Sequence, residues 1–395
     1  MTLTQIKNKS QLSKRQIEIL QDWVTQKSKG LTYNIYASLD LRISDFKTAV
    51  VDTNLFPAGF NNLCDKMLEH SSRCFGEYIR HFFPRVRTLT IYTEAHTRNL
   101  FYFKNLLALG RMVETAGFIC LFTHPLLEGE VEGLAFSLMN LKKADLILSN
   151  NDFSEGFPQL LRALDIPVIP RQHLAWTQRR KSKHFAFTKT LASELSGSLG
   201  LDPWFFSADF EVESQVDLRD QTSIDRLKDK ASRLLMRIRQ KYSEYGIADL
   251  PTLFIKDDAG TYGMGIMTIR DASELDVLSR KMINKMSVGK QHRIQSLLLQ
   301  EGVPSRLLRN GAPAEPVIYC LGNQVVGAFL RVNASRDRMS NLNSKGMEFY
   351  RLCREEIHDE PMPEECIEDC LTDGLTSVSV QVALLASALE NTSAL

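Results

Sequence analysis

Residues 252–271 read TLFIKDDAGTYGMGIMTIRD, and this stretch decides the fold of the chain. An apolar run at 252–255 is followed by the charged step KDD, a glycine-rich loop and a second apolar run at 266–269. Two short runs of β-branched and aromatic residues joined by such a link predict a β-hairpin. Glycine lets backbone N–H groups approach a phosphate because no Cβ stands in the way. The order G-x-x-G-x-G differs from the dinucleotide-binding fingerprint, so a hairpin without a ligand stays an alternative.

The parts that follow this hairpin come in a characteristic order. A helix is expected over 273–286, then a buried strand that ends in Gln300 and Glu301. Next come a strand with Glu315 (EPVIYCLG), a strand with Arg331 (VVGAFLRV) and a polar, flexible loop, ASRDRMSNLNSKG. This sequence of parts resembles the ATP-grasp fold. The resemblance is strongest over residues 325–346, which are similar to the matching segment of ribosomal-protein glutamate ligases and bacterial glutathione synthetases.

The ATP-grasp resemblance implies roles for individual residues. Lys256 and Lys181, the latter in the helix-prone stretch WTQRRKSKHFAF, would hold the nucleotide phosphates. A solvated helix face and a short nucleic-acid patch are the other interpretations of that basic stretch. Arg331 would stabilise the reacting group, so Lys256 and Arg331 are the catalytic candidates. The remaining ATP-binding candidates are the loop glycines and the adenine hinge: Gly260, Gly263, Gly265, Gln300 and Glu301.

Composition restricts the class of protein. The chain has 395 residues, a formal net charge of +1 and 24% charged residues, so no global field favours nucleic acid or a membrane surface. No apolar run approaches the roughly 20 residues that a membrane helix needs. Seven scattered cysteines without a C-x-x-C motif or an apolar signal core predict reduced thiols in a cytoplasmic protein. Small-molecule substrates are the expected partners, and homo-oligomerisation stays open.

The first half of the chain has a different pattern. Residues 85–170 alternate strands and helices at a spacing that predicts a Rossmann-like parallel sheet, with Thr97 capping a long helix. The expected organisation is α/β, becoming α+β in the C-terminal half. It consists of an N-terminal substrate-side segment (1–84), the parallel-sheet domain (85–175) and an ATP-grasp-like domain (176–395). Residues 209–220 are expected to be a linker, and residues 378–389 a buried helix.

Two polar clusters in the first half are candidate substrate sites. One is the loop DTNLFPAGFNN at 52–62, where amides and a carboxylate lie between aromatic residues on a Pro/Gly-shaped turn. The other follows the predicted parallel strands, whose carboxyl ends are where open sheets bind ligands. Backbone capping is the alternative for both clusters. The substrate candidates are Asp52, Asn54, Asn61, Asn62, Glu94, Arg98 and Asn151.

Longer motifs point to one family. The stretches DTNLFPAGFNNL, EAHTRNLFYFKN, SNNDFS, RRKS, DAGTYGMGIMT, QEGV, EPVIY and NLNSKGM resemble a bacterial type of glutamate–cysteine ligase, from about residue 33 to the C-terminus. The resemblance implies that the chain uses ATP and Mg²⁺ to join the γ-carboxylate of glutamate to the amine of cysteine through an acyl phosphate. Another ATP-grasp carboxylate–amine ligase, similar to glutathione synthetase or to a peptide glutamate ligase, is the alternative within the enzyme class.

The metal ligands are where the sequence departs from the general ATP-grasp pattern. Most such enzymes carry a late Asp and an E-x-N pair, but no E-x-N follows Arg331 here. Glu315 with Asn341 or Asn343 is the substitute set, and Glu348 comes next. This gap keeps a non-catalytic nucleotide-binding sensor as a further alternative.

Overall fold

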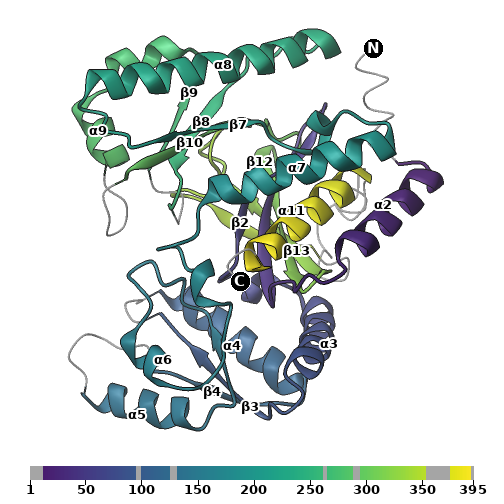
Figure 1. Ribbon diagram of the computed structural model, residues 1–395, viewed down its shortest axis with the longest axis vertical. Helices are drawn as coiled ribbons and strands as arrows, with labels where there is room; N and C mark the ends of the chain where they lie inside the picture. The colour runs from purple at the N-terminus through teal and green to yellow at the C-terminus, as the bar shows by residue number, and fades with distance from the viewer. Residues whose placement is uncertain are drawn as a thin grey trace.

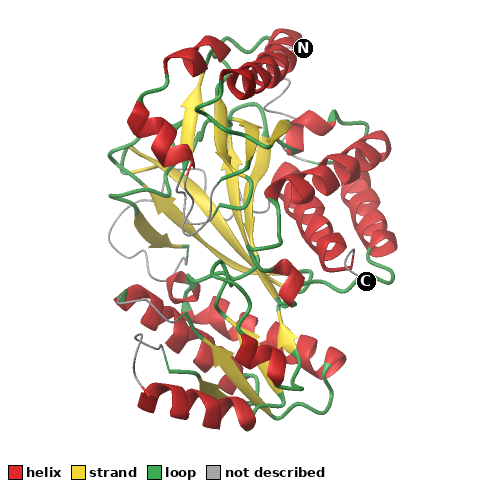
Figure 2. Ribbon diagram, turned by 60° about the vertical axis from the view of Figure 1, so that its left-hand side comes forward, coloured by secondary structure: helices red, strands yellow, loops and turns green. Residues whose placement is uncertain are grey.

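The computed structural model describes residues 12–94, 99–124, 131–260, 265–287, 294–352 and 374–392. Three sheets stack along the long axis of the molecule, with a four-stranded sheet at the top of Figure 1 and a parallel sheet at the bottom. A six-stranded sheet lies between them (Figure 2). Together they give the mixed α/β fold that the sequence predicts.

The described strands are β1 (Tyr36–Ile43), β2 (Thr48–Asn54), β3 (Thr88–Tyr92), β4 (Ile119–Phe122), β5 (Leu146–Ser149), β6 (Val168–Ile169), β7 (Phe210–Ser214), β8 (Leu253–Asp257), β9 (Ile266–Ile269), β10 (Ser296–Glu301), β11 (Leu308–Arg309), β12 (Ala312–Leu321), β13 (Gln324–Val332) and β14 (Glu348–Arg351). The described α-helices are α2 (Lys14–Lys27), α3 (Asp65–Phe82), α4 (Leu100–Thr115), α5 (Val131–Lys142), α6 (Gln159–Ala163), α7 (Lys181–Leu199), α8 (Gln221–Tyr245), α9 (Arg280–Ser287) and α11 (Gly374–Thr392).

The parallel sheet has the strand order β4-β3-β5-β6, which confirms the parallel sheet expected in this part of the chain. Its central strands, β3 and β5, are largely buried, which is typical of a parallel sheet. The predicted Thr97 cap lies outside the described residues. Helix α4 is instead capped by Asn99, whose side chain accepts a hydrogen bond from the backbone N–H of Phe101.

The six-stranded sheet joins an early part of the chain to a late part. Its order is β14-β13-β12-β1-β2, with β11 beside β12, so the N-terminal hairpin β1–β2 extends a sheet made of late strands. Alternation sends Leu39, Leu41 and Ile318 to one face, where they join the core that includes helix α11. Helix α11 is almost wholly buried, as its apolar sequence predicts. The opposite face carries charged residues toward the site.

The four-stranded sheet has the antiparallel order β7-β10-β8-β9, and the predicted hairpin is its pair β8–β9. Helix α8 packs against it (Figure 1). The expected linker at 209–220 is wrong, because residues Phe210–Ser214 pair with β10 as strand β7. Their acidic side chains are held by α8, as in the ion pairs of Glu213 with Arg226 and Lys230. The helix expected over 273–286 is divided into a 3₁₀ turn, Ala272–Val277, and α9.

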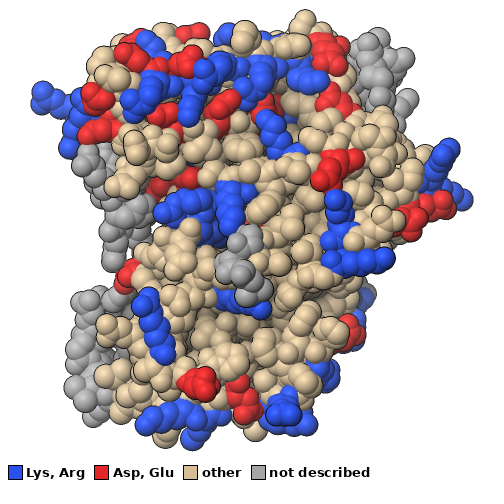
Figure 3. All heavy atoms as spheres, in the orientation of Figure 1, with Lys and Arg blue, Asp and Glu red and all other residues tan. Residues whose placement is uncertain are grey.

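Charges on the outer surface are mixed in sign. Figure 3 shows blue and red side chains side by side along α8. Several of them pair, including Arg237 with Asp209 at 2.7 Å and Lys228 with Asp276 at 2.6 Å. Within the described residues, none of the helices is long and apolar enough to span a bilayer. The thiols of Cys74, Cys120 and Cys320 are free, whereas Cys64 is disulfide-bonded, which corrects the expectation of reduced thiols for that residue.

Candidate active site

A cavity that opens to solvent lies between the six-stranded and four-stranded sheets, and its space, including the solvent at its mouth, is about 710 Å³. Its walls come from β1, β2 and β12 on one side and from β8, β9 and β10 on the other, with the start of α7 and a loop after β13 completing it. The lining residues are Asp40, Arg42, Val51, Asp52, Lys181, Phe254, Lys256, Asp257, Gly260, Ile266, Gln300, Glu301, Val303, Glu315, Asn341 and Asn343.

The wall from the four-stranded sheet is apolar at one end and basic at the other. Strand alternation turns Leu253 and Ile255 into the core and presents Phe254 and Lys256 to the cavity. Gln300 lines the same wall, and its buried Nε2 has no hydrogen-bond partner among the residues that the structure describes. A buried amide donor costs free energy unless an acceptor satisfies it, so this wall can receive a polar ligand beside an apolar surface.

Two lysines and Asp52 form the basic end of the cavity. Lys181, at the first turn of α7, forms a short ion pair with Asp52. Lys256 donates a hydrogen bond of 2.9 Å to the carbonyl of Val51. Burial lowers the pKa of Lys256 to about 8, although Asp52 acts in the opposite direction. Burial alone would raise the pKa of Asp52, but Lys181 and Lys256 hold it well below its usual range. Two cations that share one carboxylate leave positive charge available to an anion.

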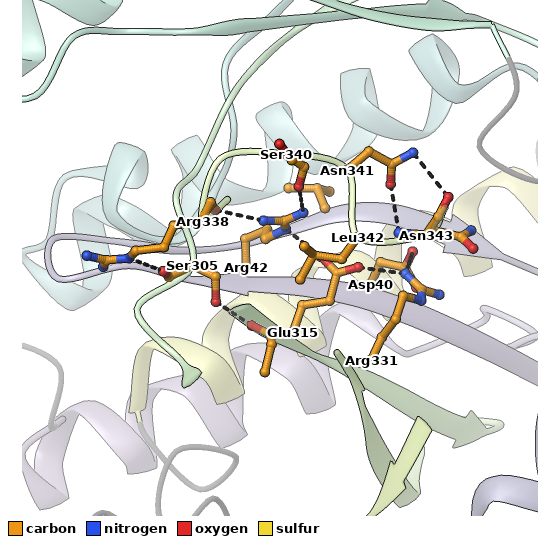
Figure 4. Close-up of polar contacts among 12 residues, drawn as sticks. Asp40, Arg42, Ser305, Glu315, Arg331, Arg338, Ser340, Asn341, Leu342 and Asn343 are labelled. Carbon is orange, nitrogen blue, oxygen red and sulfur yellow. Dashed lines mark hydrogen bonds and ion pairs between the residues drawn. The ribbon is translucent and has the colours of Figure 1, made fainter. Parts of the chain in front are cut away.

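Acidic groups from the six-stranded sheet form the facing wall. Asp40 on β1 stands directly opposite Asp52 on β2. Like charges opposite each other destabilise a sheet unless cations compensate them. Here Arg331 compensates, with Nη1 lying 2.8 Å from Asp40 Oδ2 and 2.7 Å from Glu315 Oε1 (Figure 4). Burial raises the pKa of Asp40, which Arg331 opposes and Glu315 reinforces.

The loop after β13 brings two amides to the cavity. We call residues 333–346 the amide loop. Asn341 and Asn343 line the cavity from it, and Asn341 Oδ1 accepts a hydrogen bond from the backbone N–H of Asn343. The loop was expected to be flexible, but Leu342 is fully buried and Asn333 donates to the carbonyls of Leu342 and Ser344 at 3.3 Å. The sequence therefore underestimates how firmly this loop is held.

The remaining described ATP-binding and metal candidates differ in their place and in their contacts. Glu301 accepts hydrogen bonds from Lys47 Nζ at 2.7 Å, Trp204 Nε1 at 2.9 Å and the backbone N–H of Asp209 at 3.0 Å. Gly260 lines the cavity where a Cβ would come within 2.8 Å of Asp257, and Gly265 has a positive φ of 62°. The hydroxyl of Tyr350 donates to Glu348, which is exposed on β14.

The substrate candidates that the structure describes, other than Asp52, lie at a second place, which we call the corner. It is the contact between residues 54–62 and the carboxyl ends of β3 and β5. Asn105 donates to Asn150 Oδ1 at 2.9 Å and accepts from the N–H of Phe60 at 3.0 Å, while Asn150 donates to the carbonyl of Pro57 at 2.9 Å. These contacts dock the loop on the parallel sheet.

The corner candidates themselves mostly bond to nearby protein groups. Asn54 accepts from the N–H of Phe56, Asn61 donates to Asn62, and Asn151 accepts from the N–H of Phe153. The backbone N–H of Glu94 donates to the Tyr102 hydroxyl. The structure thus brings these residues to one region without placing them in the cavity. Arg98 and Gly263 lie outside the described residues.

The architecture and this cavity can be compared with known proteins. A family model described as Glutamate-cysteine ligase matches residues 9–132 and 130–391. The chain belongs to the glutamate–cysteine ligase family. A solved structure, titled as a "Putative gamma-glutamylcysteine synthetase" from Methylobacillus flagellatus KT, is 31% identical with a TM-score of 0.83. The alignment covers 99% of this chain and 96% of that one. None of the curated proteins matches.

Membership makes this chain an ATP-dependent glutamate–cysteine ligase, of a family that generally needs a divalent metal. The donors at the cavity suit such an ion, because Asp40, Glu315, Asn341 and Asn343 offer hard oxygens. Among the described residues no group of three or more His, Cys, Asp or Glu side chains converges as a metal cage.

Sequence reasoning missed some of the lining residues, chiefly Asp40 and Arg42. Both lie on β1, where they alternate with Leu39, Leu41 and Ile43 in the run LDLRI. Two opposite charges on one face of a strand that is otherwise apolar signal a buried ion-pair network or a site. The sequence could not show that β1 pairs with β12, which places these charges beside Glu315.

Proposed function

We propose that the cavity binds ATP and that the ligase activates the γ-carboxylate of glutamate as an acyl phosphate, which the amine of cysteine then attacks. The observation that carries the proposal is the convergence of Lys181, Lys256, Gly260 and Gln300, predicted as nucleotide ligands, on one cavity. Two antiparallel sheets that face each other across it support an ATP-grasp-like arrangement for the C-terminal half, joined to a Rossmann-like domain.

In this arrangement the base lies at the apolar end of the cavity, against Phe254, Ile266 and Val303. Gln300 offers its unpaired Nε2 donor to a ring nitrogen. Because Lys47, Trp204 and Asp209 occupy the carboxylate of Glu301, this side chain supports the hinge instead of reading the adenine amino group. The phosphates lie at the basic end, where phosphate oxygens replace part of the contact of Lys181 with Asp52 and the hydrogen bond of Lys256 to the Val51 carbonyl.

The reacting end lies between the two lysines and the acidic wall. Mg²⁺, when bound, neutralises phosphate charge, and Asp40, Glu315, Asn341 and Asn343 are the side chains that would hold it. Arg331 keeps those carboxylates in place and adds positive charge where the transferred phosphoryl group becomes more negative. The residues thus position charge and exclude water, and no protein nucleophile is required.

For the amino-acid substrates, we propose that Asp52 pairs with an ammonium group and that Arg98 pairs with the α-carboxylate of glutamate. Glu94, Asn54, Asn61, Asn62 and Asn151 would line that end. Because the described corner residues already bond to protein groups, this assignment requires the corner to open when substrate binds. It is the part of the proposal that a kinetic measurement of the glutamate KM tests most directly.

The experiment that tests the reaction is ADP release from ATP and Mg²⁺ with a panel of amino acids and mass detection of the product. We expect ADP and γ-glutamylcysteine when glutamate and cysteine are both present. Release only with γ-glutamylcysteine plus glycine would instead identify a glutathione synthetase-like ligase. ATP binding without turnover on any amino acid would identify a sensor.

A further inference from the structure

Arg42 lies in the cavity wall, but each of its three guanidinium nitrogens has a partner within the protein. Its Nε lies 2.5 Å from Glu315 Oε2. Its Nη1 donates to the carbonyl of Arg338 at 3.2 Å and its Nη2 to the carbonyl of Ser340 at 2.7 Å (Figure 4). The side chain is only 6% exposed. An arginine whose three nitrogens already have acceptors is poorly suited to bind a phosphate and well suited to hold protein groups in place.

The two carbonyls that Arg42 holds belong to the amide loop, immediately before Asn341. The loop has two other hydrogen bonds at this end: the backbone N–H of Ser305 donates to the Arg338 carbonyl at 2.8 Å, and Arg338 Nε donates to the carbonyl of Ser305 at 2.6 Å. These contacts lie at the rim, since the Arg338 side chain is 49% exposed. Arg42 differs from these rim contacts because it links the loop to the acidic wall: it contacts Glu315 and both loop carbonyls at once.

We propose that Arg42 is a positioning residue that fixes the amide loop to Glu315 and so sets where Asn341 and Asn343 stand relative to the acidic wall. The role of Arg42 in holding the loop does not depend on the proposed function. Its consequence for catalysis does, because there the two amides serve the metal and phosphate end of the cavity. A planar guanidinium can serve a carboxylate and two carbonyls at fixed angles, whereas a lysine ammonium cannot span all three.

A simpler role for Arg42 is to neutralise Glu315, with no effect on the loop. Arg42→Lys separates the two roles because it keeps the positive charge and removes the fork. Arg336→Lys is the matched control, since Arg336 belongs to the same loop and is exposed, and its side chain donates only to Ser344 Oγ among the hydrogen bonds of the described structure.

The test measures amide hydrogen exchange of peptides spanning residues 338–344, together with steady-state kinetics of the same proteins. In Arg42→Lys we expect at least tenfold faster exchange in those peptides, a kcat lower by about tenfold and an ATP KM within twofold of the parent. Arg336→Lys should match the parent in every measurement. Unchanged loop exchange in Arg42→Lys, or equal changes in both variants, overturns the proposal, and so does faster exchange with an unchanged kcat.

If Arg42→Lys does not fold, the double variant R42Q/E315Q removes both buried charges together, so that no carboxylate is left unpaired. Glu315→Gln alone is its control, because it leaves Arg42 bound to both carbonyls. We expect fast loop exchange in the double variant and near-parental exchange in the control, and equal exchange in the two overturns the proposal. Exchange does not depend on turnover, so a failure of the proposed reaction would be seen separately, as a parent protein that forms no ADP.

Discussion

The cavity and the corner are two polar regions that look alike in the sequence and differ in the structure. Both consist of charged and amide side chains that follow apolar strands. At the corner, Asn105 and Asn150 satisfy each other and the backbone of the loop that they hold. In the cavity, Gln300 Nε2 has no hydrogen-bond partner within the described part of the chain, and the charge of Asp52 is balanced by both Lys181 and Lys256. The difference indicates that a ligand site is marked by polar groups that the protein leaves incompletely paired.

The largest expected effect concerns Lys256. Replacing it with Met keeps the length of the side chain and removes a charge-assisted phosphate contact worth about 1.5–3 kcal/mol, so ATP affinity should fall about 10- to 100-fold. Direct ATP binding by calorimetry measures this, and the melting temperature reports on the lost hydrogen bond to Val51. If ATP binds equally well to Lys256→Met, the cavity is not the phosphate site and the contrast with the corner has no functional meaning.

A second effect concerns the acidic wall. Asp40→Asn keeps the shape of the side chain and removes the charge that faces Arg331, so affinity for Mn²⁺ used as a spectroscopic probe should fall about tenfold. Electron paramagnetic resonance of free Mn²⁺ in the presence of a non-hydrolysable ATP analogue gives this affinity without any turnover. Asp229→Asn is the matched control, because Asp229 is exposed on α8, pairs with Arg233 and does not line the cavity. An equal loss in both variants would remove Asp40 from the proposed metal set.

The pH dependence of ATP binding should be smaller. Burial lowers the pKa of Lys256 to about 8, so the lysine loses its charge as pH rises above that value. We expect the ATP KM to rise several-fold between about pH 7.5 and 9, and the rise to disappear in Lys256→Arg. The effect of Lys256 on the stability of the fold has the opposite sign. The unfolded chain binds the proton of Lys256 more tightly than the folded protein does, so the free energy of unfolding rises as pH rises above 8. A flat profile in the parent protein would show that Lys256 keeps its proton.

The same comparison shows which parts of the fold and of the candidate site could be predicted from the sequence. Local patterns predicted the β8–β9 hairpin and the parallel sheet, because each depends on residues close in sequence. The resemblance to the ATP-grasp fold, which rests on a long, ordered series of motifs, implied the group of Lys181, Lys256 and Gln300. The pairing of β1 with β12 is a long-range contact that leaves no local signal, so Asp40 and Arg42 were missed. Strand β7 was taken for a linker because its acidic residues are typical of an exposed loop, whereas Glu213 is buried and pairs with Arg226 and Lys230 on α8.

The smallest effect on ATP should come from the corner. Asn105→Ala leaves Asn150 and the backbone N–H of Phe60 without their buried partners, which should lower the free energy of unfolding by about 1–3 kcal/mol. Because none of these groups lines the cavity, ATP affinity should stay within twofold of the parent. Denaturant unfolding and ATP calorimetry on the same preparation measure both quantities. A variant with parental stability and a raised glutamate KM would contradict this prediction. It would mean that Asn105 binds substrate, and that a polar cluster can look fully satisfied in the free protein and still be a site once its loop opens.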